Sequence, residues 1–376
     1  MIGNPDNRRV TGFVAAVRDE EAGSVVIVPW IEVARNPRWW EGHDEAPTLV
    51  RIESAGENAE VQRALLDLGG MPEAPEFPFG AFVPPVPVHR GFLALLGRIE
   101  AALQARPAWT SLAEPAGIRQ VFDKAVFHRH CQALGVAVPA ALEATDRSTL
   151  ERRMAEAGWA AAFVKIRTGS SAVGVGLFRL RPQPSFLTTV HMTDAGWFNS
   201  LRLRRYHAPA DLDRVIGGLM AHGVHIERAI DKARIDGANL DCRILMIDRQ
   251  PRFVVVRQNR HPITNLHLGG WRGRLGEMRS RCAPEVWEAA LADAERLATH
   301  YGGLHLGLDV AFTRGFRSHV VLEANAFGDL LPRLTHEGRN VYATEVAAVP
   351  AWWSKRSGTQ SSGSSSSHSP NSSSIS

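Results

Sequence analysis

Two neighbouring apolar segments, LHLGLDVAFTRG and FRSHVVLEANAF, constrain the fold more than any other part of this chain. Their alternating hydrophobicity predicts two β-strands, and Arg314-Gly315 predicts the turn that joins them into a hairpin. Asp309 lies in the first strand, while Glu323 and Asn325 stand two residues apart in the second and share one face. The pattern favours three oxygen-bearing side chains that converge on one hairpin. A hairpin whose polar residues simply face solvent has the same pattern.

Converging carboxylate and amide oxygens are typical of a site for a hard cation. Mg²⁺ fits best, because it takes only a few protein oxygens and leaves the rest of its octahedron to phosphates and water. Mn²⁺ is the alternative. The prediction is therefore a metal site formed by Asp309, Glu323 and Asn325.

Length and composition indicate a globular protein rather than a membrane or fibrous one. The 376 residues suggest two or three domains, and 44% hydrophobic with 22% charged residues is a usual balance. No apolar run is long enough to span a bilayer, and the polar start MIGNPDNRRV predicts no signal peptide. The three scattered cysteines point to a reducing cytoplasm, and a net charge of +4 gives no reason to expect nucleic acid as a partner.

Lysine is unusually rare in this chain. Only four of the 43 basic residues are lysines, namely Lys124, Lys165, Lys232 and Lys355. A lysine retained in such an arginine-rich chain indicates a need for a compact, strongly hydrated point charge, and phosphate contacts are one such need. For Lys124 alone, a solvated lysine on a helix explains the pattern equally well.

The first part of the chain predicts a small α/β unit. SVVIVPW and TLVRIES are predicted strands, while FVAAVRDE and NAEVQRALLDLG are predicted helices. The proline-rich stretch 71–90 is predicted to hold no regular helix and to form a linker or covering loop.

Two segments in the middle of the chain are candidates for binding phosphate. IRQVFDKAVFHRHCQALG predicts one helix that carries Lys124. FVKI predicts a strand that carries Lys165, and TGSSAVGVG after it predicts a small loop whose amides could close over a phosphate. It is not a Walker A loop, because the lysine precedes the glycines and no helix follows.

The strand VHIERAI is a candidate for binding a nucleotide base. An edge strand presents its backbone groups to an adenine, with Glu227 accepting a hydrogen bond from the exocyclic amine. A partly exposed edge glutamate is the alternative. Further along, LDCRILMID and PRFVVVRQN predict a hairpin, and PEVWEAALADAERLATHYGG predicts a long helix.

The ordered motifs together resemble the ATP-grasp superfamily of carboxylate–amine ligases. They run as Asp-Lys on a helix, a strand lysine with GSSAVGVG, an apolar strand with Glu227, Asp-x-Arg, Arg-Gln, TNLHLGG, Asp309 and Glu-x-Asn. The resemblance extends from Val121 to Leu334, and ITNLHLGG is most similar to the loop of the ribosomal-protein glutamate ligase branch.

The resemblance implies an α/β (α+β) chain with the ATP-grasp fold and an N-terminal pre-ATP-grasp domain. That α/β domain is expected over 1–117 with its linker at 71–90, and the ATP-grasp domain over 118–353. The serine-rich tail over 354–376 is expected to be disordered.

The resemblance also implies ATP as the nucleotide, Mg²⁺ as the metal and a role for each matching position. The implied nucleotide-binding residues are Lys124, Lys165, Gly169, Ser170, Ser171, Gly174, Glu227 and Ile230, with Asp231 as the candidate ribose contact. Arg257 and Asn265 would face the transferring phosphoryl group, and Asp309, Glu323 and Asn325 would bind the metal.

The activity implied by the resemblance is ligation through an acylphosphate, which an amine then converts into an amide or peptide bond. Two other functions stay open. One is an ATP-binding module with a regulatory or scaffolding role and no ligase activity. The other is a ligase for a peptide, whose acidic segment would meet Arg202, Arg204 and Arg205, unless that cluster is only an exposed basic strand. The expected partners are a small-molecule or peptide carboxylate and an amine, with no membrane or nucleic acid, in a monomer or a homo-oligomer.

Overall fold

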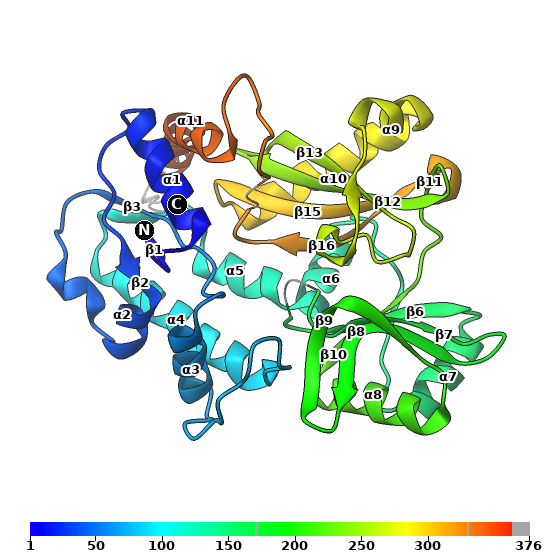
Figure 1. The fold of residues 1–376 in the computed structure, drawn as a ribbon. Coiled ribbons are helices and arrows are strands. Elements are labelled where there is room, and N and C mark those ends of the chain that lie inside the picture. Colours follow the sequence, from blue (N-terminus) through cyan, green and yellow to red (C-terminus); the bar gives the residue numbers. More distant parts are fainter. Residues whose placement is uncertain (170–171, 329–330, 363–376) are drawn as a thin grey trace, which may run out of the picture.

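The computed structural model describes the backbone of residues 1–169, 172–328 and 331–362, and the side chains of the last stretch as far as Arg356. Figure 1 shows an N-terminal unit on one side of the molecule and two sheets, one above the other, on the other side. Both sheets are antiparallel, and helices cover their outer faces.

Short parallel strand pairs form the centre of the N-terminal unit. They are β1 (Ile2–Gly3) with β2 (Val28–Pro29), and β3 (Thr48–Val50) with β4 (Trp109–Ser111). The helices around them are α1 (Arg8–Asp19), α2 (Trp30–Arg35), η1 (Trp39–Gly42), α3 (Ala59–Leu68) and α4 (Pro85–Ala105). The strands are shorter than predicted; in SVVIVPW, for example, Val26 is 61% exposed and does not join the sheet.

Helix α4 contradicts the prediction that 71–90 holds no helix. It begins at Pro85, because a proline in the first turn of a helix gives up an N–H that has no partner there. Residues 71–84 form a covering loop on strand β9 (Gly196–Tyr206). There Phe82 N donates to Trp197 O and Asn199 N donates to Gly80 O, both at 2.8 Å.

Two helices occupy the segment that was predicted to form one. They are α5 (Pro115–Phe122) and α6 (Lys124–Ala133), and Asp123 stands between them in an extended conformation. Its carboxylate caps α6 by accepting hydrogen bonds from Ala125 N at 3.0 Å and Val126 N at 3.1 Å. The cap places Lys124 at the first residue of a helix rather than in its middle.

The first six-stranded sheet carries the lysine strand and the predicted adenine strand. Its order is β5 (Ala141–Leu142), β10 (Val224–Arg228), β6 (Ala161–Ile166), β7 (Val175–Arg179), β8 (Ser185–Thr193) and β9. Helices α7 (Arg147–Glu156) and α8 (Pro209–Ala221) cover one face (Figure 1). The prediction of an edge position for β10 is wrong, because the short strand β5 pairs with it at Ile226 and Glu227.

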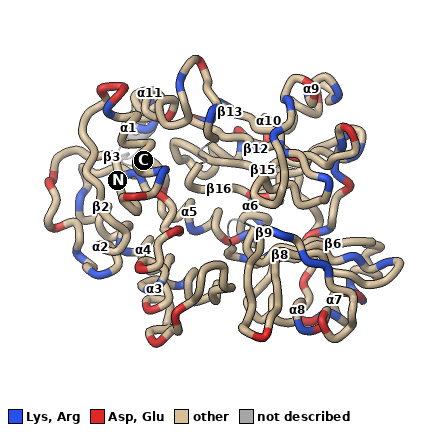
Figure 2. Tube along the Cα trace, viewed as in Figure 1, with Lys and Arg blue, Asp and Glu red and all other residues tan. Residues whose placement is uncertain are grey.

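Strand β9 ends this sheet. Arg202, Arg204 and Arg205 in its second half are exposed, and we call them the basic strip. Figure 2 shows the tube coloured blue, as for Lys and Arg, along this strand.

The second sheet carries the predicted hairpin. Its order is β14 (Trp271–Arg272), β13 (Gln250–Asn259), β12 (Ala238–Ile247), β15 (His305–Phe312) and β16 (His319–Asn325), with β11 (Arg234–Ile235) beside β12. The surrounding helices are η2 (Leu266–Leu268), α9 (Leu275–Arg281), α10 (Pro284–Tyr301) and η3 (Arg314–Phe316). The turn prediction is confirmed: Gly315 has a φ of 71° between β15 and β16, a conformation that glycine adopts without strain.

Helix α11 (Val341–Ser362) contradicts the predicted start of the tail at Ser354. Lys355 lies on this helix and its Nζ contacts Asp248 Oδ2 at 2.6 Å. The helix packs against α1, where the rings of Phe13 and Tyr342 meet edge to face with centroids 6.2 Å apart. Residues 363–376 of the predicted tail lie outside the described residues.

A buried ionic cluster fastens the N-terminal unit to this last helix. Arg51 binds Glu53 at 2.7 Å and Glu345 of α11 at 2.5 Å, and its guanidinium lies 4.2 Å from the centroid of the Phe13 ring. His305 Nδ1 lies 3.4 Å from Glu345 Oε1. We refer to Arg51, Glu53, His305 and Glu345 as the sealed network, since each of them is at most 4% exposed.

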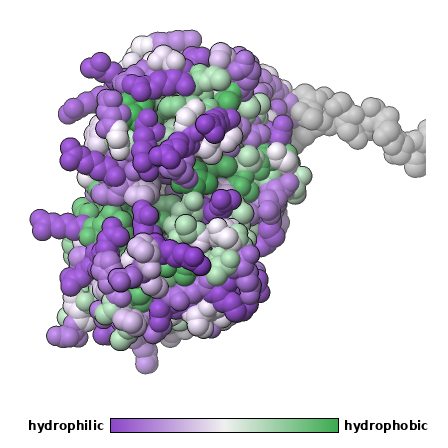
Figure 3. Space-filling view, turned by 90° about the vertical axis from the view of Figure 1, so that its right-hand side faces the viewer, coloured by the Kyte–Doolittle hydropathy of each residue, from purple (hydrophilic) through white to green (hydrophobic). Residues whose placement is uncertain are grey.

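The surface gives no sign of a membrane span. Within the described residues, no helix is both long and apolar enough to cross a bilayer. The face in Figure 3 is mostly hydrophilic, with apolar side chains showing in patches between the polar ones.

Candidate active site

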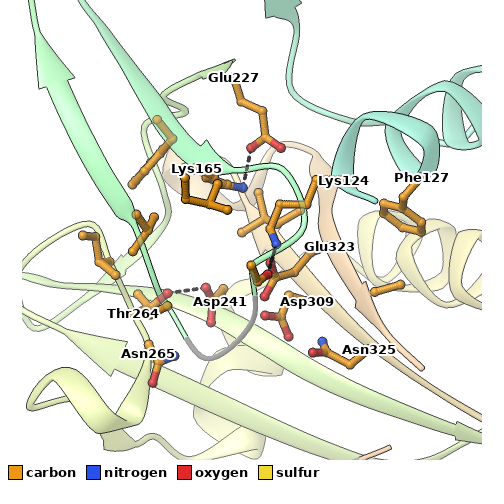
Figure 4. A pocket seen from close by; sticks show the side chains of 18 of the residues that line it. Lys124, Phe127, Lys165, Glu227, Asp241, Thr264, Asn265, Asp309, Glu323 and Asn325 are labelled. Carbon is orange, nitrogen blue, oxygen red and sulfur yellow. Dashed lines mark hydrogen bonds and ion pairs between the residues drawn. The ribbon is translucent and has the colours of Figure 1, made fainter. Parts of the chain in front are cut away.

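A cavity lies between the two sheets, and side chains from all three parts of the molecule line it. Lys124, Lys165 and Glu227 come from one wall, and Asp309 and Asn325 from the opposite wall (Figure 4). The N-terminal unit adds Arg9 and Ser54. The cavity therefore joins sites that are far apart in the sequence.

Hairpin β15–β16 brings the three predicted metal ligands together. Asp309 and Glu323 are direct cross-strand partners, and Asn325 stands opposite Gly307 on the same face as Glu323. The Asn325 Nδ2 atom is buried and has no hydrogen-bond partner among the described residues, so that amide remains available to a ligand. Two carboxylates and one amide oxygen fit Mg²⁺, which reserves further positions for phosphate and water.

Within residues 1–169, 172–328 and 331–356, there is no cluster of three or more His, Cys, Asp or Glu side chains suited to a metal ion. The predicted set contains two carboxylates, so Asn325 would have to supply its third ligand.

Lys124 and Lys165 enter the cavity from the other wall. The Lys124 ammonium donates to the carbonyl of Gly169 and lies 4.0 Å from Glu323 Oε2, while Lys165 donates to Glu227 Oε2 at 2.6 Å. Burial lowers the pKa of Lys124 more than Glu323 raises it, whereas burial of Lys165 is outweighed by Glu227 and Glu323 together and its pKa is raised.

Glu227 is more deeply buried than a partly exposed edge glutamate would be. Burial alone would raise its pKa, but Lys165 and His225 outweigh that effect and lower the pKa to about 2. The carboxylate is therefore ionised and already bonded to Lys165. Fewer of its acceptor positions are left for a nucleotide base. Ile230, three residues after Glu227, also lines the cavity.

Side chains of alternating charge form a chain along the cavity wall that carries the candidate metal ligands. Lys232 donates to Asp241 Oδ2 at 2.8 Å, Arg257 Nε donates to Asp241 Oδ1 at 2.8 Å, and Arg257 Nη2 lies 2.9 Å from Asp309 Oδ2. Arg243 Nη2 also donates to Asp309 Oδ2 at 3.3 Å. We call these five residues the cavity network.

The cations of the cavity network keep its carboxylates ionised. Burial would raise the pKa of Asp309, but Arg243 and Arg257 reverse that effect and lower it. The same holds for Asp241, whose pKa is lowered by Arg257 and Lys232 against burial. Within this network three cations serve two carboxylates, and Glu323, the cross-strand partner of Asp309, adds a third carboxylate to the same wall.

The remaining predicted residues fall at different places. Gly174 is not among the residues that line the cavity. Its φ is 59°, and a Cβ there would lie 2.4 Å from Ile166 Cγ1. Only glycine therefore fits this turn, which ends the loop predicted to close over a phosphate. Asn265 lines the cavity, and its side chain caps η2 by accepting from His267 N at 2.9 Å. Ser170 and Ser171 lie outside the described residues.

Asp231 does not line the cavity. Its carboxylate lies 3.4 Å from both Arg234 and Arg314 on the outer side of the hinge. The next residue, Lys232, lines the cavity instead. We therefore leave Asp231 out of the proposed site.

Sequence reasoning missed four cavity residues as site members: Arg9, Lys232, Asp241 and Thr264. The scarcity of lysine was a signal for Lys232, because it is one of four in the chain. Asp241 and Arg243 form the Asp-x-Arg pattern, but alternation alone does not reveal that Asp241 is buried against Thr264. Arg9 had no signal, since it reaches the cavity only through the packing of α1.

Comparisons with solved structures identify the fold. The chain is similar to the ATP-grasp ligase PsnB complexed with a minimal precursor, with 17% identity and a TM-score of 0.53 over 93% of this chain and 97% of that one. It is similar to the macrocyclase MdnC bound with precursor peptide MdnA from Microcystis aeruginosa MRC, with 12% identity and a TM-score of 0.55 over 93% and 98%. It is also similar to D-cycloserine synthetase DcsG, with 13% identity and a TM-score of 0.54 over 93% of this chain and 98% of that one.

These similarities confirm the prediction of the ATP-grasp fold, and they extend over nearly the whole of each chain. No protein-family model matches the sequence, and no curated protein matches it. At identities of 12–17%, the similarity is carried by the fold.

Proposed function

We propose that this protein is an ATP- and Mg²⁺-dependent carboxylate–amine ligase that acts through an acylphosphate. The observation that carries the proposal is the cavity itself, in which Lys124 and Lys165 face Asp309, Glu323 and Asn325 across the gap between two sheets. Phosphate-binding cations opposite a hard-cation site are what phosphoryl transfer needs, because that reaction depends on positioning and charge stabilisation.

In the proposed site, the chain would hold ATP from the first sheet. Glu227 and Ile230 would lie beside the base, and Lys124 and Lys165 would bind phosphate oxygens under the lid that starts at Gly169. Asp309, Glu323 and Asn325 would hold Mg²⁺, which supplies charge neutralisation at the phosphates. Arg257, paired to both Asp241 and Asp309, is fixed in position to meet charge that develops on the transferred group.

The proposed reaction has two steps. An oxygen of the substrate carboxylate bonds to the γ-phosphorus as the bond from that phosphorus to the β,γ-bridging oxygen breaks, and ADP leaves. The amine nitrogen then bonds to the acyl carbon, phosphate leaves, and the nitrogen loses a proton. Closure of the lid would exclude water, which otherwise hydrolyses the acylphosphate.

A peptide is the substrate class that one surface observation favours. The covering loop occupies the first half of the β9 edge, while Arg202, Arg204 and Arg205 lie exposed on the second half. A strand edge with a basic strip suits an extended acidic segment, which would add main-chain hydrogen bonds and ion pairs. PsnB and MdnC, which share the fold, are complexed with a precursor peptide.

The test is ADP release that depends on a carboxylate, screened over amino acids, acidic peptides and cell extract, with the product identified by mass spectrometry. Glu323→Gln and Asn325→Ala should each lower turnover by at least about a hundredfold, the scale of losing one stabiliser of the transition state. Glu277→Gln, which removes a partly exposed carboxylate paired with Arg281 outside the cavity, is the matched control and should leave turnover unchanged. Normal turnover in the Glu323 or Asn325 variant would refute the metal assignment.

The same screen separates the ligase from an ATP-binding module. A module would bind ATP with an affinity that depends on Lys165, yet would release no ADP with any carboxylate. A protein that binds no ATP at all would refute both functions.

A further inference from the structure

Arg9 is a cavity residue supplied by the N-terminal unit. It lies in the first turn of α1, and its Nη1 donates to the carbonyl of Phe327 at 3.2 Å. Phe327 follows Asn325 by two residues, so this bond holds the guanidinium beside the strand that carries the candidate metal ligands. Arg9 therefore lies on the side of the cavity that carries the candidate metal ligands. Glu227 and Ile230 lie on the opposite side.

The carboxylates of the cavity are already paired with other cations. Glu227 binds Lys165, Asp241 binds Lys232 and Arg257, Asp309 binds Arg257, and Glu323 lies near Lys124. Among the residues that the structure describes, no carboxylate forms an ion pair with Arg9. The charge of Arg9 opposes the rise in the pKa of Glu345, but that carboxyl is already bonded to Arg51. A partly exposed guanidinium that lines a cavity without a carboxylate partner is suited to an external anion.

Arg9 shares the cavity lining with several apolar side chains. Its bonding partner Phe327 packs against Phe122 with ring centroids 5.8 Å apart, and Phe122 and Val121 also line the cavity. Ser54 adds a hydroxyl from the N-terminal unit. Low polarity around a guanidinium strengthens its attraction to a carboxylate and favours the planar two-bond pairing that arginine offers.

Arg228 also lines the cavity and forms no ion pair with a carboxylate in the described part of the chain, but it is the last residue of β10, next to Glu227. A residue there would meet the nucleotide base rather than the second substrate. Arg9 is bonded to Phe327, which stands two residues beyond the strand of the candidate metal ligands, so it lies on the side where the acceptor of the phosphoryl group would bind.

We propose that Arg9 binds a second anionic group of the substrate, a carboxylate other than the one that takes the phosphoryl group. Lys124, Lys165 and Arg257 are assigned to the phosphates and to the transferred phosphoryl group, and no contact joins Arg9 to those side chains in the described structure. The substrate class is then a dicarboxylic acid or an acidic peptide segment with two carboxylates. This assignment rests on the proposed function for the position of the phosphoryl acceptor.

The experiment measures binding of paired probes to the full-length protein by calorimetry, with and without Mg²⁺ and a non-hydrolysable ATP analogue. The probes are succinate, glutarate and adipate, each beside its own monoamide, so that only the second charge and its spacing change. In the wild type, at least one diacid should bind about tenfold or more tightly than its monoamide, the scale of one charge-assisted pair.

Arg9→Gln should reduce that preference to within about twofold, and Arg9→Lys should keep part of it, because lysine retains the charge but not the planar fork. Arg8→Gln is the matched control, since Arg8 is the exposed neighbour on the same turn and does not line the cavity. It should behave as the wild type. Affinity for the ATP analogue should be the same in all four proteins, and their thermal unfolding should coincide.

Two results would overturn the proposal: a wild type that binds each diacid no better than its monoamide, or an Arg9→Gln variant that keeps the preference. The ATP analogue separates this failure from failure of the proposed function. If the analogue does not bind, the ligase proposal fails, while the diacid titration without nucleotide still reports on Arg9.

Discussion

The two buried ionic networks of this protein use opposite ratios of charge. In the sealed network, one arginine, Arg51, serves two carboxylates, Glu53 and Glu345. In the cavity network, three cations serve the two carboxylates Asp241 and Asp309. One network is short of positive charge and closed to solvent, and the other has an excess of it beside a cavity.

The difference shows what each network can do. Two buried carboxylates that share one cation cannot both stay ionised without a large desolvation cost. Burial therefore raises the pKa of Glu345, although Arg51 opposes this rise. His305 beside it has its pKa lowered to about 3, by burial first and by Arg51 second, and is neutral. The cavity network keeps its carboxylates ionised and still has positive charge to offer to a phosphate. The first arrangement can fasten two parts of a chain, and the second can bind a ligand.

The largest expected effect comes from breaking the sealed network. Arg51→Met keeps the length of the side chain against Phe13 but leaves two carboxylates buried without a cation, which costs about 3–5 kcal/mol. The measurement is the urea midpoint of unfolding. Arg35→Met removes an arginine from an exposed pair with Glu60 and should cost about 1 kcal/mol or less. Equal midpoints for the two variants would mean that the sealed network contributes no more than a surface pair.

The second change tests the cavity network. Arg257→Ala leaves Asp241 with Lys232 and Asp309 with Arg243, so its stability loss should be smaller than that of Arg51→Met. Its turnover should fall by roughly a hundredfold while ATP affinity stays within several-fold, because a group that meets developing charge acts on the transition state. ATP calorimetry beside ADP release measures both. Loss of ATP binding equal to the loss of turnover would make Arg257 a ground-state phosphate ligand.

A third change asks whether the cavity needs compact charge as well as positive charge. Lys165→Arg keeps the charge but replaces a point charge with a bulkier planar fork, so ATP should bind about tenfold or more weakly. Lys355→Arg is the matched control, because it keeps the charge beside Asp248 at a site remote from the cavity. An ATP titration in which both variants match the wild type would refute a special role for the rare lysines.

The smallest expected effect is a loss of folding stability with rising pH, which we expect from Glu345 of the sealed network. The folded pKa of Glu345 is raised above the ordinary value of 4.5, so the folded state holds this proton more tightly than the unfolded chain. The stabilisation is complete below pH 4.5 and is lost as pH rises through the folded pKa. Relative to Glu345→Gln, the wild type should therefore lose stability as pH rises from 4.5.

Urea midpoints at a series of pH values measure this difference. Glu60→Gln, which changes an exposed carboxylate, is the control. The stability of the wild type relative to Glu60→Gln should not fall as pH rises from 4.5. A wild type that gains stability over Glu345→Gln as pH rises would show that Arg51 lowers the pKa of this carboxyl instead.

Local patterns were enough to predict the β15–β16 hairpin that carries the candidate metal ligands. Asp309, Glu323 and Asn325 are placed by alternation and by one turn, all within a short stretch, so their convergence follows from the strand period. The lysine strand and its lid were predicted for the same reason. The break at Asp123 was missed because the helical pattern runs through it, and only its cap on Ala125 and Val126 reveals two helices.

The sealed network could not be predicted, because its burial is a non-local effect. Arg51 and Glu53 look like an exposed pair on a strand, and Glu345 lies 294 residues from Arg51 in the sequence. The start of the tail was predicted too early for a related reason. Serine-rich composition begins near Ser354, but helix α11 continues because its preceding turns pack on α1.

The packing of α11 against α1 also has a consequence for synthesis on the ribosome. The N-terminal unit emerges first, yet Glu345 and Tyr342, which complete the surroundings of Arg51 and Phe13, come 294 and 329 residues later in the chain. At about 5–20 residues per second, these partners follow after roughly 15 to 70 seconds. During that interval Arg51 and the apolar face of α1 are left without their native cover, so this face is where a nascent chain would need protection from aggregation.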